Sequence, residues 1–477
     1  MAEVLYHAVP TDWWREEKYR FLDGKEDVAR IEWQMLEPDD KHTWLRAGMV
    51  DEFDTFLPLG TKLAKQMDVG GEGAIFKNYS LGVSTNRDSV VYDFDRVALV
   101  KRVEQFCDDY NAELARYESR GKPEDLDGFL DYGKVKWSRN LKRALRQGIR
   151  LEFDAKAIRT ALYRPFTTLH LYFAETLVDE EAQMRVFFPE QAKGNRGIVV
   201  SDIGLRSAFS MFATDTISDL HLCASTDAFQ CFPFYTYAED GSERRENITD
   251  WALKEFQTRY GDKNISKWDI FHYVYAVLHH PRYRERYAAN LRRELPRIPF
   301  VAAEVTRLTS KPGAKATKED GASSRRLLQD AEVFHAFAKA GKILANLHVG
   351  YEQAKEYPLR RRENPKAQLN WRVEKMKLSK DKSALIYNGF LTLEGIPPET
   401  FAYLLGNRSA LEWVIDQYQV STDKRSGITN DPNRPDDPEY IVRLIGQVIT
   451  VSLETVKLVK GLPSWEVFPA VSEKHPL

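Results

Sequence analysis

The stretch KWDIFHYVYAVLHHPRYRERYAANLRREL, residues 267–295, decides the fold class of this chain. It is long, and its apolar residues recur at the spacing typical of helices. Pro281 interrupts the pattern and predicts two helices, and Pro296 and Pro299 close the second one. From residue 251 onward the chain is therefore expected to be mostly helical.

The chain upstream of this stretch has a different character. Short apolar runs bounded by Gly, Asp and Pro predict strands, namely GIVVSD (197–202), DLHLCA (219–224) and CFPFYTY (231–237). Residues 74–94 are expected to form strand, loop and strand around the polar tip SLGVSTNRDS, and residues 96–120 an amphipathic helix. The expected class is α+β, with a mixed, β-rich N-terminal half and a mostly helical C-terminal half.

Changes of composition divide the chain into three expected segments. Residues 1–130 form an α/β segment with the SLGVSTNRDS loop, and 131–250 carry a basic helix and a β-rich core. Residues 251–477 form a helical domain with a Lys-, Gly- and Ser-rich insertion at 308–325. Within that domain we expect a hairpin at 383–396 that turns at Asn388-Gly389, and helices at 328–348, 398–419 and 437–460.

Composition fits a folded, soluble protein, with 43% hydrophobic and 29% charged residues among 477. No apolar leader or run of about 18 apolar residues occurs, so we expect neither a signal peptide nor a membrane span, and a cytoplasmic location. The three cysteines have no CxxC spacing and are expected to be reduced core thiols. The net charge of −2 neither supports nor excludes a nucleic acid, so the distribution of charge has to decide.

Common catalytic motifs are missing from the sequence. It has no GxxxxGK[ST] loop, no GxGxxG after a strand, and neither HExxH nor GxSxG. A methyltransferase segment that holds a flipped adenine is also missing, because Pro397-Pro398 follows Ile396 and resembles a helix start. His279 and His280 are adjacent, point in different directions and lack an obvious third ligand. We therefore expect no catalytic residue, metal or cofactor in this chain.

The clearest candidate for a binding surface is KVKWSRNLKRALRQGIR, residues 134–150, which has seven basic residues and no acidic one. On a helix expected over 136–150, the basic residues form one stripe, opposite an apolar face that includes Trp137, Leu141 and Leu145. The stripe consists of Arg139, Lys142, Arg143, Arg146 and Arg150. Such a helix buries one face and offers the other to a polyanion, and its alternative role is a solvated face paired with local acids.

Three further motifs are weaker candidates. Ser84–Asp88 contains Asn86 and Arg87, residue types that read adenine and guanine, but an ordinary polar turn has the same composition. Tyr163-Arg164-Pro165-Phe166 is better explained as a packing corner, with Arg164 in an ion pair inside the fold, than as a base contact. A second basic patch runs from Arg360-Arg361-Arg362 through Lys366, Arg372, Lys375 and Lys377, and like charges in a row favour a solvated, extended segment.

The order of several segments along the chain is more specific than any one of them. These segments are KNYSLGVSTNRDSVVYDF, ALYRPFTTLHLYF, CFPFYTY, IFHYVYAVLHHPRYRERYAANLRRELPRIPF, LANLHVGY, NGFLTLEGIP and LEWVIDQY. Their succession, from about residue 30 to 460, resembles the C-terminal region of Type ISP restriction–modification enzymes. In that family one polypeptide carries a nuclease, a helicase-like motor, an adenine-N6 methyltransferase and a C-terminal target-recognition domain.

The resemblance implies that this chain corresponds to the target-recognition domain and lacks the other parts. A partner methyltransferase, with a possible helicase–nuclease subunit, would bind S-adenosylmethionine and flip the adenine, while this chain would bind double-stranded DNA. Arg139, Lys142, Arg143 and Arg146 are then expected to contact phosphates, and Asn86 and Arg87 to read bases. The alternatives are an assembly module without DNA contact and a nuclease with an unfamiliar site.

Overall fold

The computed structural model describes residues 3–10, 13–38, 42, 44–66, 73–190, 194–303, 319–424 and 426–467. The chain divides into two units, Met1–Val50 and Asp51–Leu477. None of the described helices has the length and apolar character that a bilayer span requires.

The first unit is small and has little core. Strand β1 (Val4–Tyr6) pairs antiparallel with β2 (Gln34–Leu36), and helix α1 (Arg15–Lys25) and the 3₁₀ turn η1 (Val28–Arg30) lie between them in sequence. Ile31 is the only buried apolar residue among the described residues of this unit, and no residue of α1 is buried. Tertiary packing therefore contributes little to the stability of α1.

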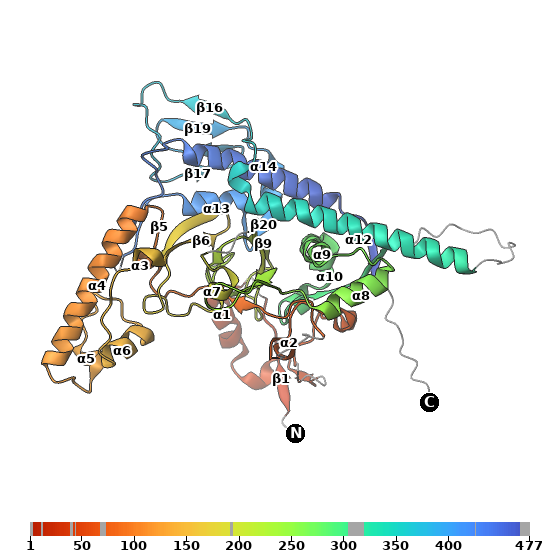
Figure 1. Cartoon of the computed structure of the whole chain (residues 1–477), viewed down its shortest axis with the longest axis horizontal. Coiled ribbons are helices and arrows are strands. Elements are labelled where there is room, and N and C mark those ends of the chain that lie inside the picture. Colours follow the sequence, from red (N-terminus) through yellow and green to blue (C-terminus); the bar gives the residue numbers. More distant parts are fainter. Residues whose placement is uncertain are drawn as a thin grey trace. The chain divides into compact units, whose positions relative to one another are not determined.

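Two four-stranded sheets organise the first part of the second unit (Figure 1). One has the order β10-β6-β7-β5, with β6 (Ile158–Arg164) and β7 (Thr167–Tyr172) joined at Pro165-Phe166, flanked by β10 (Ile217–Ser218) and β5 (Tyr92–Asp93). The other has the order β4-β11-β8-β9, built from β4 (Ser80–Leu81), β11 (Phe229–Pro233), β8 (Gly197–Ser201) and β9 (Met211–Thr214). The strands expected in GIVVSD and CFPFYTY are confirmed.

The strand expected in DLHLCA is wrong. Asp219 makes a single parallel bridge to Val83, and residues 220–223 form turns because the Asp219 carboxylate, which pairs with Arg164, also accepts the backbone N–H of His221, 2.9 Å away. The hairpin expected at 74–94 is wrong as well. β4 pairs with β11 whereas β5 pairs with β7, and between them the short helix α3 (Asp88–Val91) begins at a turn in which the N–H of Arg87 donates to Thr85 Oγ1.

Helix α4 (Arg96–Ser119) confirms the helix expected at 96–120, and Asp95 caps its N-terminus. The basic helix α6 (Arg139–Arg146) is shorter than the expected 136–150. Ser138 caps its start by accepting the N–H of Leu141, and Gly148, with φ of 73°, lies just beyond its end. The expected helical face is confirmed within these limits, because Leu141, Ala144 and Leu145 are buried.

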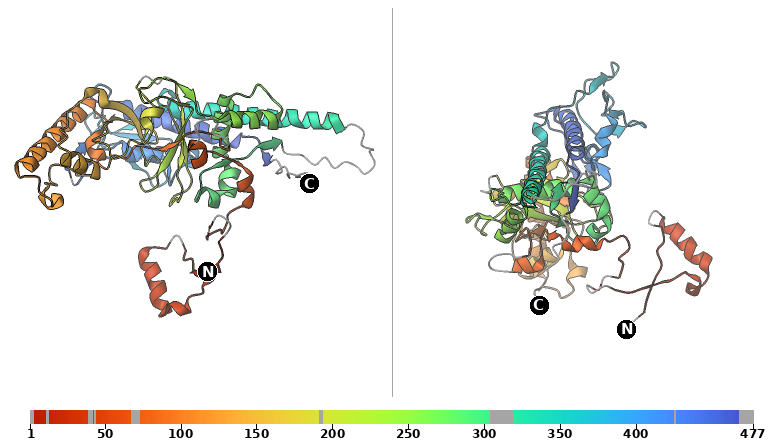
Figure 2. Two further views of the ribbon diagram at one scale, coloured as in Figure 1. Left: turned by 60° about the horizontal axis from the view of Figure 1, so that its bottom comes forward. Right: turned by 90° about the vertical axis from the view of Figure 1, so that its right-hand side faces the viewer.

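The third part of the chain is mostly helical, as expected, and Pro281 divides its long helix at the predicted position. The helices are α8 (Asp250–Tyr260), α9 (Lys267–His279), α10 (Pro281–Arg286), α11 (Ala288–Leu291), α12 (Glu319–Val349), α13 (Ala410–Gln417) and α14 (Tyr440–Lys460). α12 packs against α9 and α14 (Figure 2). Of the expected insertion at 308–325, residues 308–318 lie outside the described residues and the rest begins α12.

The hairpin predicted at 383–396 is confirmed as β18 (Ala384–Ile386) and β19 (Leu391–Glu394). It belongs to a sheet of order β16-β19-β18-β17, with β16 (Arg360–Glu363) and β17 (Lys377–Leu378) at its edges. The single helix expected at 398–419 is wrong. A 3₁₀ turn η5 (Pro398–Ala402) and the pair β20 (Leu404–Leu405) and β21 (Arg408–Ser409) precede α13, because Gly406, with φ of 68°, turns the chain back.

Two strand pairs join segments that are distant in the sequence. β3 (Leu57–Pro58) pairs with β14 (Arg297–Ile298) across the boundaries expected at 130 and 250, and β15 (Val301–Ala303) pairs with β24 (Trp465–Val467) within the third expected segment. Two short ribbons complete the strands: β12 (Tyr235–Thr236) with β13 (Arg245–Glu246), and β22 (Ser421–Thr422) with β23 (Thr429–Asn430). The remaining short helical segments are η2 (Asp51–Thr55), α2 (Lys62–Gln66), α5 (Leu126–Phe129), η3 (Ala155–Ala157), α7 (Met184–Phe187) and η4 (Tyr351–Gln353). The α+β class is confirmed.

Candidate nucleic-acid interface

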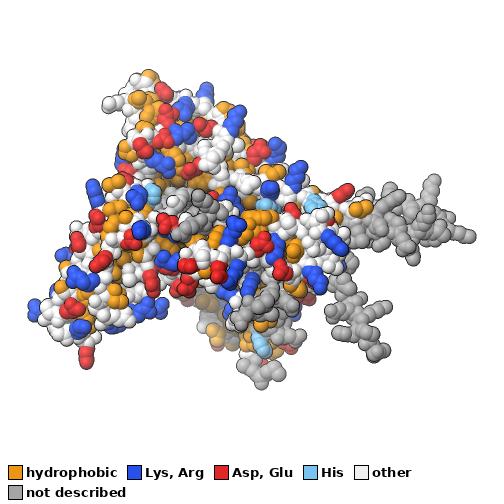
Figure 3. Space-filling view, in the orientation of Figure 1, with side chains coloured by type: hydrophobic (Ala, Val, Ile, Leu, Met, Phe, Trp, Pro, Cys, Tyr) orange, Lys and Arg blue, Asp and Glu red, His pale blue; other side chains and the backbone are white. Residues whose placement is uncertain are grey.

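The exposed face of α6 carries the arginines that the sequence singled out. Arg139, Arg143 and Arg146 are exposed, and none of them forms an ion pair with another described residue. Lys142 differs, because its ammonium pairs with Asp127 and lies 5.4 Å from the ring centre of Tyr132. Figure 3 shows Lys and Arg side chains exposed over the region of α4, α5 and α6. Of the five cations in the expected stripe, three are thus available to an anion, Lys142 is shared with a carboxylate, and Arg150 lies beyond the end of the helix.

Arg87 does not lie on an exposed tip, and its predicted contact with a base is wrong for this structure. Its side chain is fully buried, and its guanidinium donates to the Leu177 carbonyl and to the Ser138 hydroxyl, the N-cap of α6. Burial lowers the pKa of Arg87 to about 10, and the negative charge of Asp179 opposes this shift. Arg87 therefore connects the 84–89 loop to the start of the basic helix.

Asn86 is exposed, with φ of 55°, as a polar turn residue often is. Its Nδ2 donates to Asp179 Oδ2 at 2.7 Å, and Asn140 of α6 donates to the carbonyl of Asp179 at 2.5 Å. Asn86 thus helps to fix the loop beside α6. Its role in reading bases stays a prediction.

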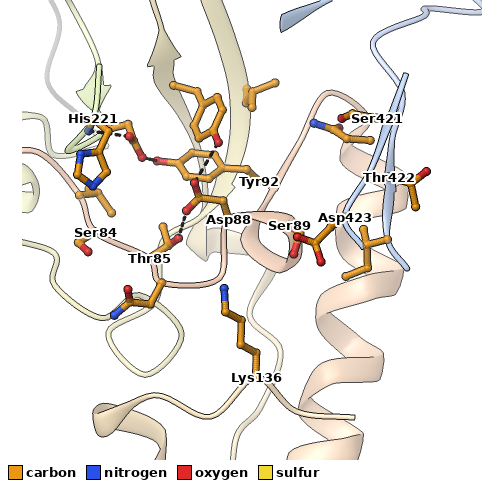
Figure 4. A pocket seen from close by; sticks show the side chains of 17 residues that line it. Ser84, Thr85, Asp88, Ser89, Tyr92, Lys136, His221, Ser421, Thr422 and Asp423 are labelled. Carbon is orange, nitrogen blue, oxygen red and sulfur yellow. Dashed lines mark hydrogen bonds between the residues drawn. The ribbon is translucent and has the colours of Figure 1, made fainter. Parts of the chain in front are cut away.

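A hollow of about 590 Å³ opens beside this loop (Figure 4). Asp88, at its centre, accepts hydrogen bonds from Thr85 and, at 3.0 Å, from the hydroxyl of Tyr163. Figure 4 shows Lys136 below Asp88, with its amine directed into the hollow, and Ser421, Thr422 and Asp423 on the opposite side from Thr85. Carboxylates, hydroxyls and an amine from four separate segments therefore line one hollow.

The Tyr163–Phe166 corner supports the floor of this hollow. Arg164 is 2.7 Å from Asp219, and both side chains are buried, which confirms the ion pair expected for Arg164 inside the fold. Burial raises the pKa of Asp219, and the adjacent Arg164 opposes that shift. The hydroxyl of Tyr92 donates to the other oxygen of Asp219 at 3.3 Å.

Two further hollows adjoin the first, as their shared residues show. One, of about 630 Å³, shares Ser89, Lys136, Asp423 and Ile428 with it and is also lined by Lys134. The other, of about 450 Å³, shares Tyr163, and its polar lining comes from other segments of the chain. That lining includes Arg206, Ser225, Thr226, Asn407, Arg408 and Gln417. We call the three hollows together the polar trough.

The other basic patches are largely neutralised within the fold. Arg360 and Arg362 pair with Glu394 on the neighbouring strand, and Arg361 pairs with Glu439 at 2.7 Å. Arg372 pairs with both Glu374 and Asp431. In the stretch 273–297, Arg286 pairs with Glu52 and Arg284 donates to the carbonyl of Phe209. The arginines of the second patch are therefore engaged, whereas its lysines Lys366, Lys375 and Lys377 are exposed and form no ion pair with another described residue.

Neither histidine of the His279-His280 pair is placed for metal binding. His279 is buried, and its Nδ1 lies 2.8 Å from the carbonyl oxygen of Tyr275. Within the described part of the chain, no group of three His, Cys, Asp or Glu residues is arranged to hold a metal ion. The three cysteines are free and buried, as expected for core thiols.

Sequence reasoning missed the ribbon β22–β23 and Lys136 as parts of the site. The signal for the ribbon was present, because STDKRSGITN, residues 421–430, has a Ser-Gly turn flanked by β-branched residues. Lys136 belonged to the basic stretch, but it lies before α6 begins and lines the trough instead of joining the stripe.

Comparison with known proteins identifies the class of this fold. Residues 74–444 match the model of the Type ISP C-terminal specificity domain, and the chain belongs to this family. The resemblance inferred from the order of the sequence segments is thereby confirmed. No curated protein matches the chain.

Three solved structures of larger proteins are similar to this chain. A nuclease-deletion mutant of the Type ISP restriction–modification enzyme LlaGI, in complex with a DNA substrate mimic, is 30% identical with a TM-score of 0.78; the match covers 98% of this chain and 39% of that one. A DrdV–DNA complex is 36% identical with a TM-score of 0.79, and the match covers 97% of this chain and 43% of that one. The ATP-dependent Type ISP restriction–modification enzyme LlaBIII bound to DNA is 28% identical with a TM-score of 0.77, and the match covers 95% of this chain and 28% of that one. This chain therefore spans less than half the length of each.

Proposed function

We propose that this chain is the sequence-specific DNA-recognition module of a restriction–modification or phage-defence system that methylates adenine at N6. Catalysis comes from a methyltransferase partner or from a part of the enzyme outside this chain, and S-adenosylmethionine binds there. A helicase–nuclease subunit is a further expected partner. The observation that carries the proposal is the set of unpaired arginines on α6 beside the polar trough, in a family whose similar solved structures hold DNA.

The arginines supply affinity that does not depend on sequence. Each phosphate that Arg139, Arg143 or Arg146 neutralises releases condensed counterions. Lys142 contributes less, because a phosphate has to compete with Asp127 for its ammonium. The trough supplies groups for sequence recognition, since its hydroxyl, amide and carboxylate groups match the donors and acceptors on base edges.

An additional role in assembly is supported by the first unit. Trp14, Tyr19 and Leu22 are 77%, 56% and 49% exposed, and the unit has almost no core of its own. Exposed aromatic and aliphatic side chains on a weakly packed unit are typical of a surface that contacts another protein. This observation favours contact with a catalytic partner in addition to DNA, and does not replace DNA binding.

A DNA-shift assay with the full chain tests the proposal. We expect binding to randomised duplexes that weakens by orders of magnitude between about 50 and 200 mM salt. In the triple variant Arg139→Glu, Arg143→Glu, Arg146→Glu, the slope of log Kd against log salt should fall by roughly 2 to 3, because about 0.9 is lost per phosphate contact.

The matched control reverses the same number of charges elsewhere. Arg360→Glu, Arg361→Glu and Arg362→Glu change arginines that already pair with Glu394 or Glu439, and should leave the slope near that of the parent chain. A parent chain that does not bind duplex DNA, or a triple variant that binds as the parent does, would refute the proposed function. Metal-dependent cleavage by the chain alone would support a nuclease instead.

A further inference from the structure

The ribbon β22–β23 stands at the border between two hollows of the polar trough. Asp423 and Ile428, which continue the two strands, line both hollows, and Ser421, Thr422 and Asn430 line the first. In Figure 4, Ser421 and Asp423 face the trough from the side opposite Thr85 and Asp88, whereas the side chain of Thr422 points to the other face of the ribbon. Ser421, Thr422 and Thr429 are exposed, so this ribbon presents small polar side chains to solvent.

The ribbon is held firmly although its strands are short. Thr422 pairs with Thr429, and their hydroxyls are 2.9 Å apart, within hydrogen-bonding distance across the ribbon. Asp423 Oδ1 accepts from both the N–H and the hydroxyl of Ser426, each at 2.8 Å, and the N–H of Gly427 donates to the Asp423 carbonyl. Ile428 packs against the main core. The polar face is therefore presented in a fixed position.

We propose that the ribbon β22–β23 enters the major groove and reads base edges through Thr422 and Thr429, which pair across the ribbon and share its exposed face. This inference rests on the proposed function and names the element that gives it specificity. A two-stranded ribbon, with strands about 4.8 Å apart, fits a major groove about 12 Å wide. Threonine hydroxyls both donate and accept, and threonine methyls contact the thymine methyl.

The charges around the ribbon agree with this placement. Lys134 and Lys136 line the hollow that Asp423 and Ile428 of the ribbon also line, and they precede α6, so cations for the flanking phosphates lie beside the element that reads bases. Asp88, which lines the adjoining hollow, disfavours a phosphate at that point.

The other candidate for base reading is the 84–89 loop, and its side chains are already engaged. Arg87 is buried, and Asn86 donates to Asp179. The exposed hydroxyls of Thr422 and Thr429 have hydrogen-bond partners only in each other among the described residues. These two hydroxyls can exchange their mutual hydrogen bond for contacts with a base, and no hydrogen bond between them and the core is broken.

The test is selection from randomised duplexes, compared between the parent chain and two variants. Thr422→Val with Thr429→Val removes both hydroxyls and keeps the shape and β propensity of each residue. We expect the base preference at one or two positions to weaken by about tenfold, which is typical of a lost base contact, while affinity for unrelated DNA changes less than twofold. Thr422→Val alone removes one hydroxyl, and should weaken the preference at one position only.

Thr236→Val is the matched control, because Thr236 belongs to another two-residue ribbon, β12–β13, and lines none of the three hollows. It should leave every preference unchanged, and melting curves of all variants check the fold. A parent chain with a clear preference that both ribbon variants retain, or a uniform loss of affinity for all sequences, would overturn this inference alone. A parent chain without any preference overturns the proposed function, and the inference with it.

Discussion

Arg87→Met is the substitution that best separates the two roles considered for the 84–89 loop. If Arg87 reads a base, the variant folds normally and changes its DNA preference. The structure instead places the side chain in the interior, where it connects the loop to the N-cap of α6. Methionine has a similar length and no charge, so it fills much of the space but makes neither hydrogen bond.

The expected cost follows from those two bonds. Hydrogen bonds from a charged donor contribute roughly 1.5–3 kcal/mol each. The variant also leaves the Leu177 carbonyl and the Ser138 hydroxyl without this donor. Part of this loss is offset, because the substitution also removes a buried cation. Burial lowers the pKa of Arg87 to about 10, and its Nε has no hydrogen-bond partner among the described residues. We expect a net destabilisation of about 3 kcal/mol.

Thermal unfolding by circular dichroism measures this cost. An unfolding entropy of roughly 2.1 cal/mol/K per residue, summed over a unit of this size, converts 3 kcal/mol into a fall in Tm of about 3 °C. At a temperature where the variant is still folded, its base preference should equal that of the parent chain. An unchanged Tm together with an altered preference would refute the reasoning and restore Arg87 as a base contact.

Two other predictions concern stability. Burial lowers the pKa of His279 to about 4, so below about pH 6.5 the unfolded chain takes up a proton that the folded chain excludes, and stability falls as the pH drops toward 4. In urea unfolding, the parent chain should therefore lose about 2 kcal/mol more stability between pH 6.5 and 5 than His279→Gln does, and equal losses would contradict this. In hydrogen exchange on the chain alone, amides of α1 should exchange within seconds and those of α9 far more slowly, because α1 buries no residue whereas most of α9 is buried; protection of α1 comparable to that of α9 would show that another surface of the chain covers it.

Elements governed by local periodicity could be predicted from the sequence. α4 and the break between α9 and α10 follow directly from the spacing of apolar residues and from Pro281. The hairpin β18–β19 follows from Asn388-Gly389. In each case the signal and the structure it specifies lie within about 25 residues, so no distant segment is needed to interpret the pattern.

Elements governed by distant partners could not be predicted. The 74–94 stretch has the alternation of a hairpin, but its two strands pair with β11 and β7, which lie far along the chain. DLHLCA has the composition of a strand, yet only Asp219 makes a strand bridge, to the distant Val83, and residues 220–223 form turns. The polar trough is the extreme case, since residues from 83 to 430 meet in it, and no window of sequence contains them together.

The same limit applies to charge, and it explains why one basic patch is available and another is not. The Arg360–Arg362 run is as basic as α6, but β19 places Glu394 beside it and the turn before α14 adds Glu439. Residues 134–150 contain no acid, and the nearby Asp127 is taken by Lys142. What makes a patch able to bind phosphate is therefore not its number of cations. It is how few carboxylates the fold brings within reach of them, and by that measure the arginines of α6 are available to DNA whereas those of the Arg360–Arg362 run are not.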